Sequence, residues 1–365
     1  MKRAFLLLCM VLVACIPAAR SLEPFLERKP DPVRDQGAHR APVEWYYLNA
    51  HLETKNGTRG IAAAIFQVLI PENTPYNLAN IFPDPIYFGH YSIVNKQTGA
   101  FQSVEYSTVP RAKPEIATGI GYARTERMDV GLGDWRITRE PNGIYSAKFS
   151  LRGGREAIDL RLRPTRPEAV HGPGWSGTKE TGRMYYYSAT RLEISGTYNG
   201  ESVGGIAWLD HQWGGSEIGD GSASTSPRWD WMCMNLEDGR DVMVYRVYNQ
   251  KGQIADQFAS IVLPDGSVRE ERNFTMQAWD WWDSPAGGRY PIRWHVKLND
   301  GTVLNVKPVT NAQEVEARAT AGFNYYEGAI EISGSTRGVG YMELTGYTPM
   351  RGSPFTNPFG FLEPR

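Results

Sequence analysis

Apolar and polar residues alternate along much of the chain with a period of two residues. The alternation is clearest over 158–163 (IDLRLR), and it returns over 145–151 and 294–298. Because successive side chains of a strand point to opposite faces, this pattern predicts antiparallel strands with one buried face and one face in water. No long segment has the spacing of an amphipathic helix, and only 313–319 is a candidate for one short helical turn.

Turn-forming dipeptides recur between the predicted strands. Such pairs tolerate the positive φ that tight hairpins require. The sequence therefore predicts an all-β protein of up-and-down antiparallel sheets, which could close into barrels and leave no free edge. Asn or Asp precedes Gly at 56–57, 142–143, 199–200, 238–239, 265–266 and 300–301.

A change in composition divides the chain into two parts. Residues 214–227 are rich in Gly, Ser and Thr, which indicates a domain boundary or a mobile loop. We predict a first domain over 30–215 and a second over 216–365, each long enough for a small barrel or curved sheet. The segment 71–85 is rich in Pro and Asn and predicts a long loop, either a plain surface loop or a lid.

The N-terminal residues 1–20 have the pattern of an export signal. Two basic residues precede an apolar run over 4–14, which is too short to span a bilayer comfortably. Residues 12–15 (LVAC) resemble a bacterial lipobox, in which Cys15 would become a lipidated N-terminus; the alternative is ordinary cleavage near 19–21. We expect an exported protein, periplasmic or an outer-membrane lipoprotein, attached to a membrane only through a lipid anchor.

Composition narrows the possible functions. The net charge is −1, from 39 basic and 40 acidic residues without a long basic run, which argues against a nucleic-acid partner. Aromatic residues make up 12% of the chain, which favours a large core or a broad pocket lined with rings. Two of the three cysteines lie in the signal, so Cys233 has no partner for an intramolecular disulfide. We expect it to be a small buried residue.

The segment 184–215 is the first candidate for chemistry. It predicts two strands around the turn at Asn199, and the second strand ends in Asp210, His211 and Trp213. On a regular strand, Asp210 faces one side and the other two face the opposite side. An Asp210 that points among rings would have a raised pKa and could donate a proton; alternatively it orients its neighbours. His211 is either catalytic or a structural hydrogen-bonding residue.

Other acids and rings are also candidates. Trp229 and Trp231 share one strand face, with Asp230 on the other. Paired indoles can stack on a flat ligand or stabilise a cation, and they can also fill a core. Glu44 stands beside three rings in EWYY, and Tyr187 belongs to a run of three tyrosines; Glu44 either faces a ligand or pairs with an arginine.

Several familiar motifs are missing. The histidines have neither the H-x-H nor the H-E-x-x-H spacing, so the sequence gives no support for a metal site. The G-x-S-x-G elbow of serine hydrolases and the glycine-rich nucleotide loops are also missing. We therefore expect no cofactor.

A series of motifs nevertheless resembles one known family. DQGAH at 35–39 and EWYY at 44–47 lie near the start, GIAWLDHQWG at 205–214 in the middle, and YEG at 326–328 and YMELTGY at 341–347 near the end. They resemble, in order, motifs of the AttH and carotenoid 1,2-hydratase family of lipocalin-like proteins, often labelled predicted secreted hydrolases. The resemblance covers nearly the whole mature chain.

The resemblance implies a fold, a pocket and a chemistry. The fold would be two tandem lipocalin-like (calycin) β-barrels, with a ligand pocket at or near their junction. Family hydratases add water across an isoprenoid double bond, with an Asp acid supported by His, Trp and Tyr. His211 and Trp213 match this pattern, and the acid would be Asp210 or Asp230. Other members are encoded beside ABC exporter subunits.

Two hypotheses follow for an exported protein that binds a long apolar isoprenoid or lipid. In the first, it is a cofactor-free hydratase: a protonated Asp210 or Asp230 protonates a C=C bond, ring faces stabilise the cation, and His211 positions water. In the second, it is a non-catalytic lipid carrier of the envelope that works with an ABC transporter permease; a plain structural role is a third class. The predicted ligand-binding residues are Glu44, Tyr187, Trp213, Trp229 and Trp231.

Overall fold

The computed structural model describes residues 22–69, 85–109, 116–118, 120–215 and 228–348. Their regular structure is almost entirely β-strand, joined by turns and loops, and η3 (Arg152–Gly154) is a short 3-10 helix. The predicted all-β class is therefore confirmed. The export signal with Cys15, the Pro-rich loop and the Gly/Ser-rich boundary fall wholly or largely outside the described residues.

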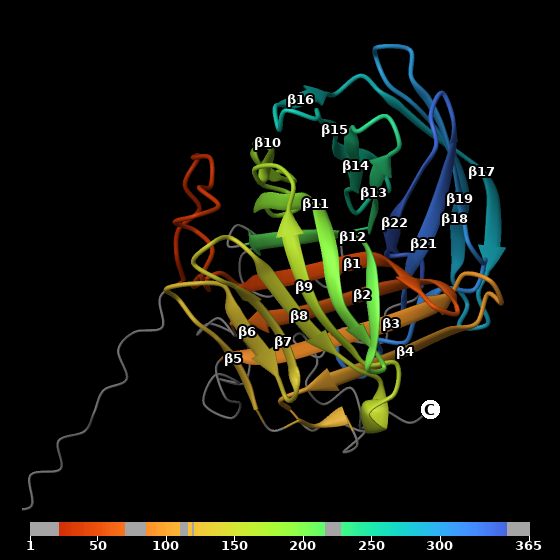
Figure 1. Cartoon of the computed structure of the whole chain (residues 1–365). Helices are drawn as coiled ribbons and strands as arrows, with labels where there is room; N and C mark the ends of the chain where they lie inside the picture. Colours follow the sequence, from red (N-terminus) through yellow and green to blue (C-terminus); the bar gives the residue numbers. More distant parts are fainter. Residues whose placement is uncertain (1–21, 70–84, 110–115, 119, 216–227, 349–365) are drawn as a thin grey trace, which may run out of the picture.

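The first sheet contains twelve antiparallel strands and closes nearly into a barrel (Figure 1). Its order is β4-β3-β2-β1-β12-β11-β9-β8-β7-β6-β5, with β10 paired to β11. Ser107 at the end of β4 forms a bridge with Ala117, just before β5, so the two edges lie close together. The strands are β1 (Val43–Thr54), β2 (Gly57–Val68), β3 (Ile86–Asn95), β4 (Phe101–Ser107), β5 (Gly121–Ala123), β6 (Asp129–Leu132), β7 (Trp135–Arg139), β8 (Tyr145–Phe149), β9 (Ile158–Pro164), β10 (Ala169–Ser176), β11 (Met184–Tyr198) and β12 (Glu201–Gly214).

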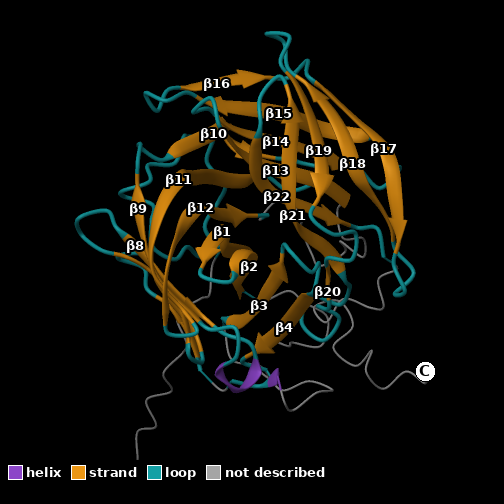
Figure 2. Cartoon of the chain, turned by 45° about the vertical axis from the view of Figure 1, so that its right-hand side comes forward, coloured by secondary structure: helices purple, strands orange, loops and turns teal. Residues whose placement is uncertain are grey.

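The second sheet contains ten antiparallel strands and forms a half-barrel. Its order is β16-β15-β14-β13-β22-β21-β19-β18-β17, with β20 paired to β21. Figure 2 shows this curved sheet stacked against the first. The strands are β13 (Arg228–Leu236), β14 (Asp241–Tyr248), β15 (Ile254–Val262), β16 (Val268–Glu271), β17 (Thr275–Asp283), β18 (Arg289–Lys297), β19 (Val303–Pro308), β20 (Glu314–Val315), β21 (Tyr325–Gly334) and β22 (Gly338–Thr345).

Strands far from the junction of the two sheets show the alternation that the sequence predicts. In β9, Ile158, Leu160 and Leu162 are buried and the residues between them are exposed. The buried set packs in the interior of the first sheet with residues such as Tyr145 and Phe149. One face of these strands thus builds the core while the other meets water.

Strands at the junction are buried on both faces. In β1, Tyr46 and Leu48 point into the core of the first sheet, whereas Tyr47 belongs to a separate core between the sheets. Tyr47 shares that second core with Trp208 of β12 and Trp231 of β13. The fold thus has an interior for each sheet and a third packed layer between them, and this third layer carries the candidate site.

Residues 313–319 do not form the helical turn that their spacing allowed. Glu314 and Val315 form β20, which pairs with β21. The side-chain amide of Gln313 donates to the carbonyl oxygens of Thr310 (3.0 Å) and Ala329 (3.2 Å). These bonds hold the segment extended against β21, so tertiary pairing overrides the local preference.

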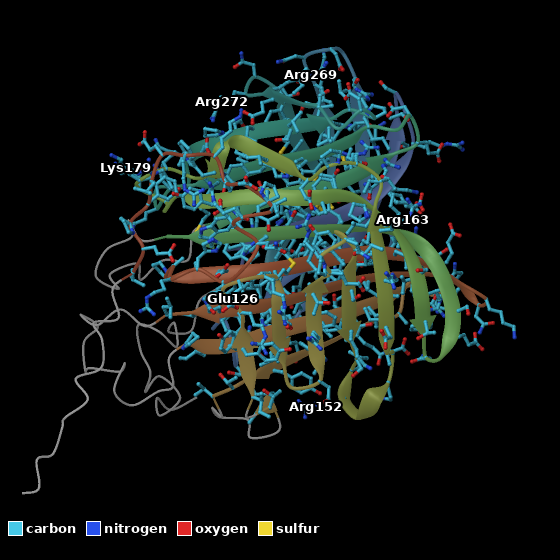
Figure 3. All side chains as sticks on the ribbon, turned by 60° about the vertical axis from the view of Figure 1, so that its left-hand side comes forward. Glu126, Arg152, Arg163, Lys179, Arg269 and Arg272 are labelled. Atoms are coloured by element: carbon cyan, nitrogen blue, oxygen red, sulfur yellow. The ribbon has the colours of Figure 1, made fainter. Side chains whose placement is uncertain are left out.

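Charged side chains gather on the outside of the molecule. Figure 3 shows Arg269 and Arg272 at the outer edge of the second sheet and Arg152 at the far end of the first. Among the described residues there is no helix with the length and apolar character that a membrane span needs.

Candidate functional site

A cavity of about 420 Å³ lies between the two sheets. Its walls come from β1, β2, β3, β10, β11 and β12 of the first sheet and β13, β14, β21 and β22 of the second. The volume is in the range of pockets that bind drug-sized molecules. Apolar and aromatic side chains dominate the lining; they include Val43, Trp45, Tyr47, Phe66, Phe88, Met184, Tyr186, Trp229, Trp231, Tyr245 and Tyr325.

Three carboxylic acids reach this cavity. Glu327 of β21 and Glu343 of β22 are direct partners in the antiparallel register, which places their Cβ atoms about 4.5–5.5 Å apart on one face. Asp210 of β12 lines the cavity from the first sheet. Glu327 and Asp210 are buried, and Glu343 is partly buried. The cavity is therefore apolar except for three acids, which could exchange protons with a ligand.

The surroundings favour the neutral form of these acids. Burial raises the pKa of Glu327 well above its usual range, the neighbouring Glu343 raises it further, and a hydrogen bond from Tyr47 opposes the shift. Removal from bulk water raises the pKa of Glu343 to about 7 and that of Asp210 to about 7. Burial thus keeps Glu327 protonated near neutral pH, whereas Glu343 and Asp210 gain and lose their protons there.

Each glutamate is fixed through one oxygen. The Tyr47 hydroxyl donates to Oε1 of Glu327 at 2.7 Å. Trp229 Nε1 donates to Oε1 of Glu343 at 2.7 Å, and the Thr345 hydroxyl donates to the same atom at 3.2 Å. Among the described residues, neither Oε2 has a hydrogen-bond partner. Each side chain is therefore oriented and still has an oxygen free for a ligand.

Asp210 uses both of its oxygens within the protein. Ser188 Oγ and Trp208 Nε1 donate to Oδ1, and the Tyr186 hydroxyl donates to Oδ2 at 3.1 Å. Ser188 Oγ also lies 2.8 Å from Nε2 of the buried His171. A carboxyl group with three donors already in place is better suited to position its neighbours than to donate a proton to a ligand.

The rings around the acids are held in fixed orientations. Trp231 Nε1 donates to the Tyr186 hydroxyl at 3.0 Å, and the Trp231 ring meets Tyr47 edge to face with 5.6 Å between centroids. Trp208 also meets Trp231 edge to face, with 6.5 Å between centroids. Fixed rings around neutral acids would suit an apolar ligand in which positive charge develops.

Most of the chain matches a known family. The model of the AttH-like family matches residues 28–347. The chain belongs to the AttH-like family. None of the curated proteins matches this AttH-like chain.

Two solved structures are similar to this AttH-like chain. One is a protein of Nitrosomonas europaea assigned to AttH, with a TM-score of 0.72 and 27% identity over 88% of this chain and 98% of that protein. The other is kievitone hydratase of Nectria haematococca, with a TM-score of 0.59 and 16% identity over 89% of this chain and 99% of that enzyme. The second likeness shows a shared fold.

Four residues predicted from the sequence form a second cluster, away from the cavity. His211 and Trp213 lie on the face of β12 opposite Asp210, and they meet Glu44 and Tyr187 there. His211 Nε2 lies 2.7 Å from Glu44 Oε1, and His211 Nδ1 lies 2.9 Å from the Tyr187 hydroxyl. Burial would raise the pKa of Glu44, but hydrogen bonds from His211 and His39 hold it at about 2. None of the four lines the cavity.

The other predicted residues divide between the cavity and a core. Trp229 and Trp231 line the cavity, as does Asp210. Asp230, on the opposite face of β13, accepts hydrogen bonds from the hydroxyls of Tyr248 (2.6 Å) and Tyr347. The catalytic roles predicted for Asp210, Asp230 and His211 stay predictions, and the structure does not bring the three together.

Glu327 and Glu343 are not among the site residues predicted from the sequence. Each lies in a motif that carries the family resemblance, YEG and YMELTGY. Each is also an acid between small or apolar neighbours in its strand, Tyr326 and Gly328 for Glu327 and Met342 and Leu344 for Glu343. A single buried acid in a strand is only a weak signal. Its meaning depends on the register that places the two side chains opposite each other, and sequence periodicity does not give that register.

Proposed function

We propose that this AttH-like protein is a cofactor-free hydro-lyase that adds water to a C=C bond of an apolar, isoprenoid-type ligand. The observation that carries the proposal is the pair Glu327 and Glu343, which face one apolar cavity from neighbouring strands. Their surroundings differ, because Glu327 is buried and Glu343 is partly buried. Neighbouring acids with different proton affinities can divide the roles of acid and base.

The reaction needs one proton donor and one proton acceptor. Glu327 gives its Oε2 proton to the less substituted alkene carbon, and the π electrons form the new C–H bond. The tertiary cation that remains is stabilised by ring faces such as that of Trp231. A water molecule then attacks the cation and loses its proton to Oε2 of Glu343. Transfer of that proton from Glu343 to Glu327 restores the acid and the base, so alkene and water give a tertiary alcohol.

The dimensions of the site and the family support this proposal. The cavity volume suits a drug-sized molecule or part of a longer chain. Kievitone hydratase has the same overall fold. Export, with Cys15 as the site of lipidation, is part of the proposal and would place the activity in the bacterial envelope.

The apolar lining of the same cavity favours a second candidate function. A carrier needs an enclosed apolar site and no proton transfer, and barrels of this size can hold one apolar ligand. In this case the protein would hold a lipid in the envelope and pass it to an ABC transporter permease. The two functions differ in one measurable respect, because only the hydratase changes the ligand.

The test is conversion in isotopically labelled water. The mature protein is incubated in H₂¹⁸O with a prenylated phenol, which carries a trisubstituted alkene, and the extract is analysed by mass spectrometry. We expect a product heavier by one labelled water. Glu331 is a control acid outside the cavity: it lies on the same strand as Glu327, its side chain is 43% exposed, and it pairs with Lys307. The Glu331→Gln variant should therefore form the labelled product like the wild type. Saturable binding of the phenol without labelled product would favour the carrier.

The pH dependence of turnover should reveal the two roles. Glu343 must be ionised to accept a proton, and desolvation puts its pKa at about 7. Turnover should therefore fall as the pH drops below about 7. Glu327 must be protonated, and burial raises its pKa well above the usual range, so turnover should also fall at high pH. The measurement is kcat/KM across the pH range.

A variant of Trp229 provides the check on that profile. The indole N–H of Trp229 lowers the pKa of Glu343. Trp229→Phe keeps an aromatic ring and removes the donor, so the acidic limb of the profile should move to higher pH. A rate that keeps rising as the pH falls below 7 would contradict the base role of Glu343.

A further inference from the structure

Two histidines and a tyrosine converge on one carboxylate oxygen inside the first sheet. His39 Nδ1 lies 2.9 Å from Oε1 of Glu44, His211 Nε2 lies 2.7 Å from the same atom, and the Tyr46 hydroxyl lies 3.1 Å from it. Glu44 and Tyr46 are on β1, His211 is on the neighbouring β12, and His39 precedes β1. The nitrogens of His39 and His211 and the oxygen of Glu44 lie within 4.8 Å of one another.

Further hydrogen bonds hold the other polar side-chain atoms of Glu44 and His211. Oε2 of Glu44 accepts from the backbone N–H of His39 at 2.8 Å and from Gln67 Nε2 at 3.2 Å. His211 Nδ1 lies 2.9 Å from the Tyr187 hydroxyl. Metal-binding histidines and carboxylates are oriented by hydrogen bonds of this kind to their remaining polar atoms. These contacts fix the carboxylate of Glu44 and the imidazole of His211 beside His39.

The carboxylate of Glu44 has more polar neighbours than it has lone pairs to accept hydrogen bonds. An ionised carboxylate has about four lone-pair sites, two on each oxygen. Glu44 has two neighbours on Oε2 and three on Oε1. A cation between Oε1 and the two imidazole nitrogens would relieve this excess, since each ligand would then direct a lone pair at the metal.

We infer that His39, Glu44 and His211 bind a divalent transition metal of the zinc class. Two imidazoles and one carboxylate are the donors that zinc accepts, whereas calcium and magnesium prefer oxygen alone. Zinc bonds of about 2.0–2.2 Å in a tetrahedron separate the ligand atoms by about 3.3 Å. The observed separations of 2.7 and 2.9 Å need to widen by about half an ångström. Tyr46 or a water molecule would take the fourth position.

The position of this site indicates a structural role. Glu44 and His211 are fully buried, and the side chain of His39 is 11% exposed. The His39 ring stacks on Trp213 with 3.9 Å between centroids. His39 belongs to the segment that precedes β1, so a metal would fasten this segment to β1 and β12. The site is separate from the cavity between the sheets, and its existence does not depend on the proposed hydratase activity.

The test is direct metal binding to the folded mature protein. After treatment with a chelator, the protein is titrated with Zn²⁺ by calorimetry and with Co²⁺ by visible absorption. We expect about one equivalent of each metal to bind, with the intense Co²⁺ bands of a tetrahedral site. Elemental analysis of protein purified without added metal should also show zinc.

Variants separate this site from adventitious binding. His39→Ala changes a residue outside the strands and should weaken Zn²⁺ binding by at least about 100-fold, beyond the loss seen when only a supporting residue is removed. His295→Ala, at an exposed histidine of β18, should leave binding unchanged. The inference is wrong if the wild-type protein binds no stoichiometric Zn²⁺ or gives only weak Co²⁺ bands. It is also wrong if folded His39→Ala binds Zn²⁺ as tightly as the wild type. The wild-type spectra decide the matter if the variant fails to fold.

Discussion

Glu327→Gln should lower turnover of a prenylated substrate by about 10²–10⁴-fold, the usual contribution of a positioned general acid. Glutamine has nearly the same shape and can still accept the hydrogen bond from the Tyr47 hydroxyl, which lies 2.7 Å from Oε1 of Glu327. It cannot give a proton to an alkene carbon. The cavity and its fixed rings would remain, so binding of the substrate should change little. The measurement is kcat and KM for the variant beside the wild type.

Comparison with the other acids makes this result specific. Glu343→Gln should also lower kcat, because no base would then accept the proton that the attacking water loses. Asp210→Asn should have a smaller effect, since Asp210 already accepts three hydrogen bonds from its own chain. If Asp210→Asn removes all turnover while Glu327→Gln keeps it, the acid is Asp210 and our assignment is wrong.

The sequence predicted the strands well where each strand has one wet face. The alternation of β9 (Ile158–Pro164) is visible in the sequence and is confirmed in the fold. It is lost in strands such as β3 (Ile86–Asn95) and β14 (Asp241–Tyr248), where nearly every residue is buried. These strands lie between two packed layers, so both faces are apolar and the period of two disappears. The same strands line the cavity, so the sequence pattern is least informative for the strands that form the site.

Residues of the two clusters illustrate a second limit. Asp210 and His211 are adjacent in the sequence, and the strand geometry predicts opposite faces for them. The sequence left open which face meets a ligand. In the structure, Asp210 faces the cavity between the sheets and His211 faces the interior of the first sheet. Glu327 and Glu343 meet only through the pairing of β21 with β22, which no local pattern encodes.

Asp241→Asn should reduce the stability of the folded protein by about 3–5 kcal/mol, the usual effect of breaking a buried ion pair. Asp241 is fully buried at the start of β14, and its carboxylate contacts Arg191 Nη2 at 2.6 Å and Arg166 Nη1 at 3.2 Å. Thr190 and Asn235 also donate to it, at 2.9 and 2.7 Å. The neutral amide would leave two guanidinium groups without their counter-charge. The measurement is chemical unfolding of the variant and the wild type.

The same ion pairs join the two sheets, so the loss should extend to the cavity. Arg191 lies on β11 and Asp241 on β14, and the cavity depends on the relative position of these sheets. Calorimetry of Asp241→Asn should show the unfolding transition broaden or split, because multidomain proteins lose two-state behaviour when their parts separate. The control is Asp238→Asn, whose carboxylate is 34% exposed and pairs with Arg240; a surface pair of this kind contributes about 0–1 kcal/mol. Equal stability of the two variants would show that the buried cluster does not hold the sheets together.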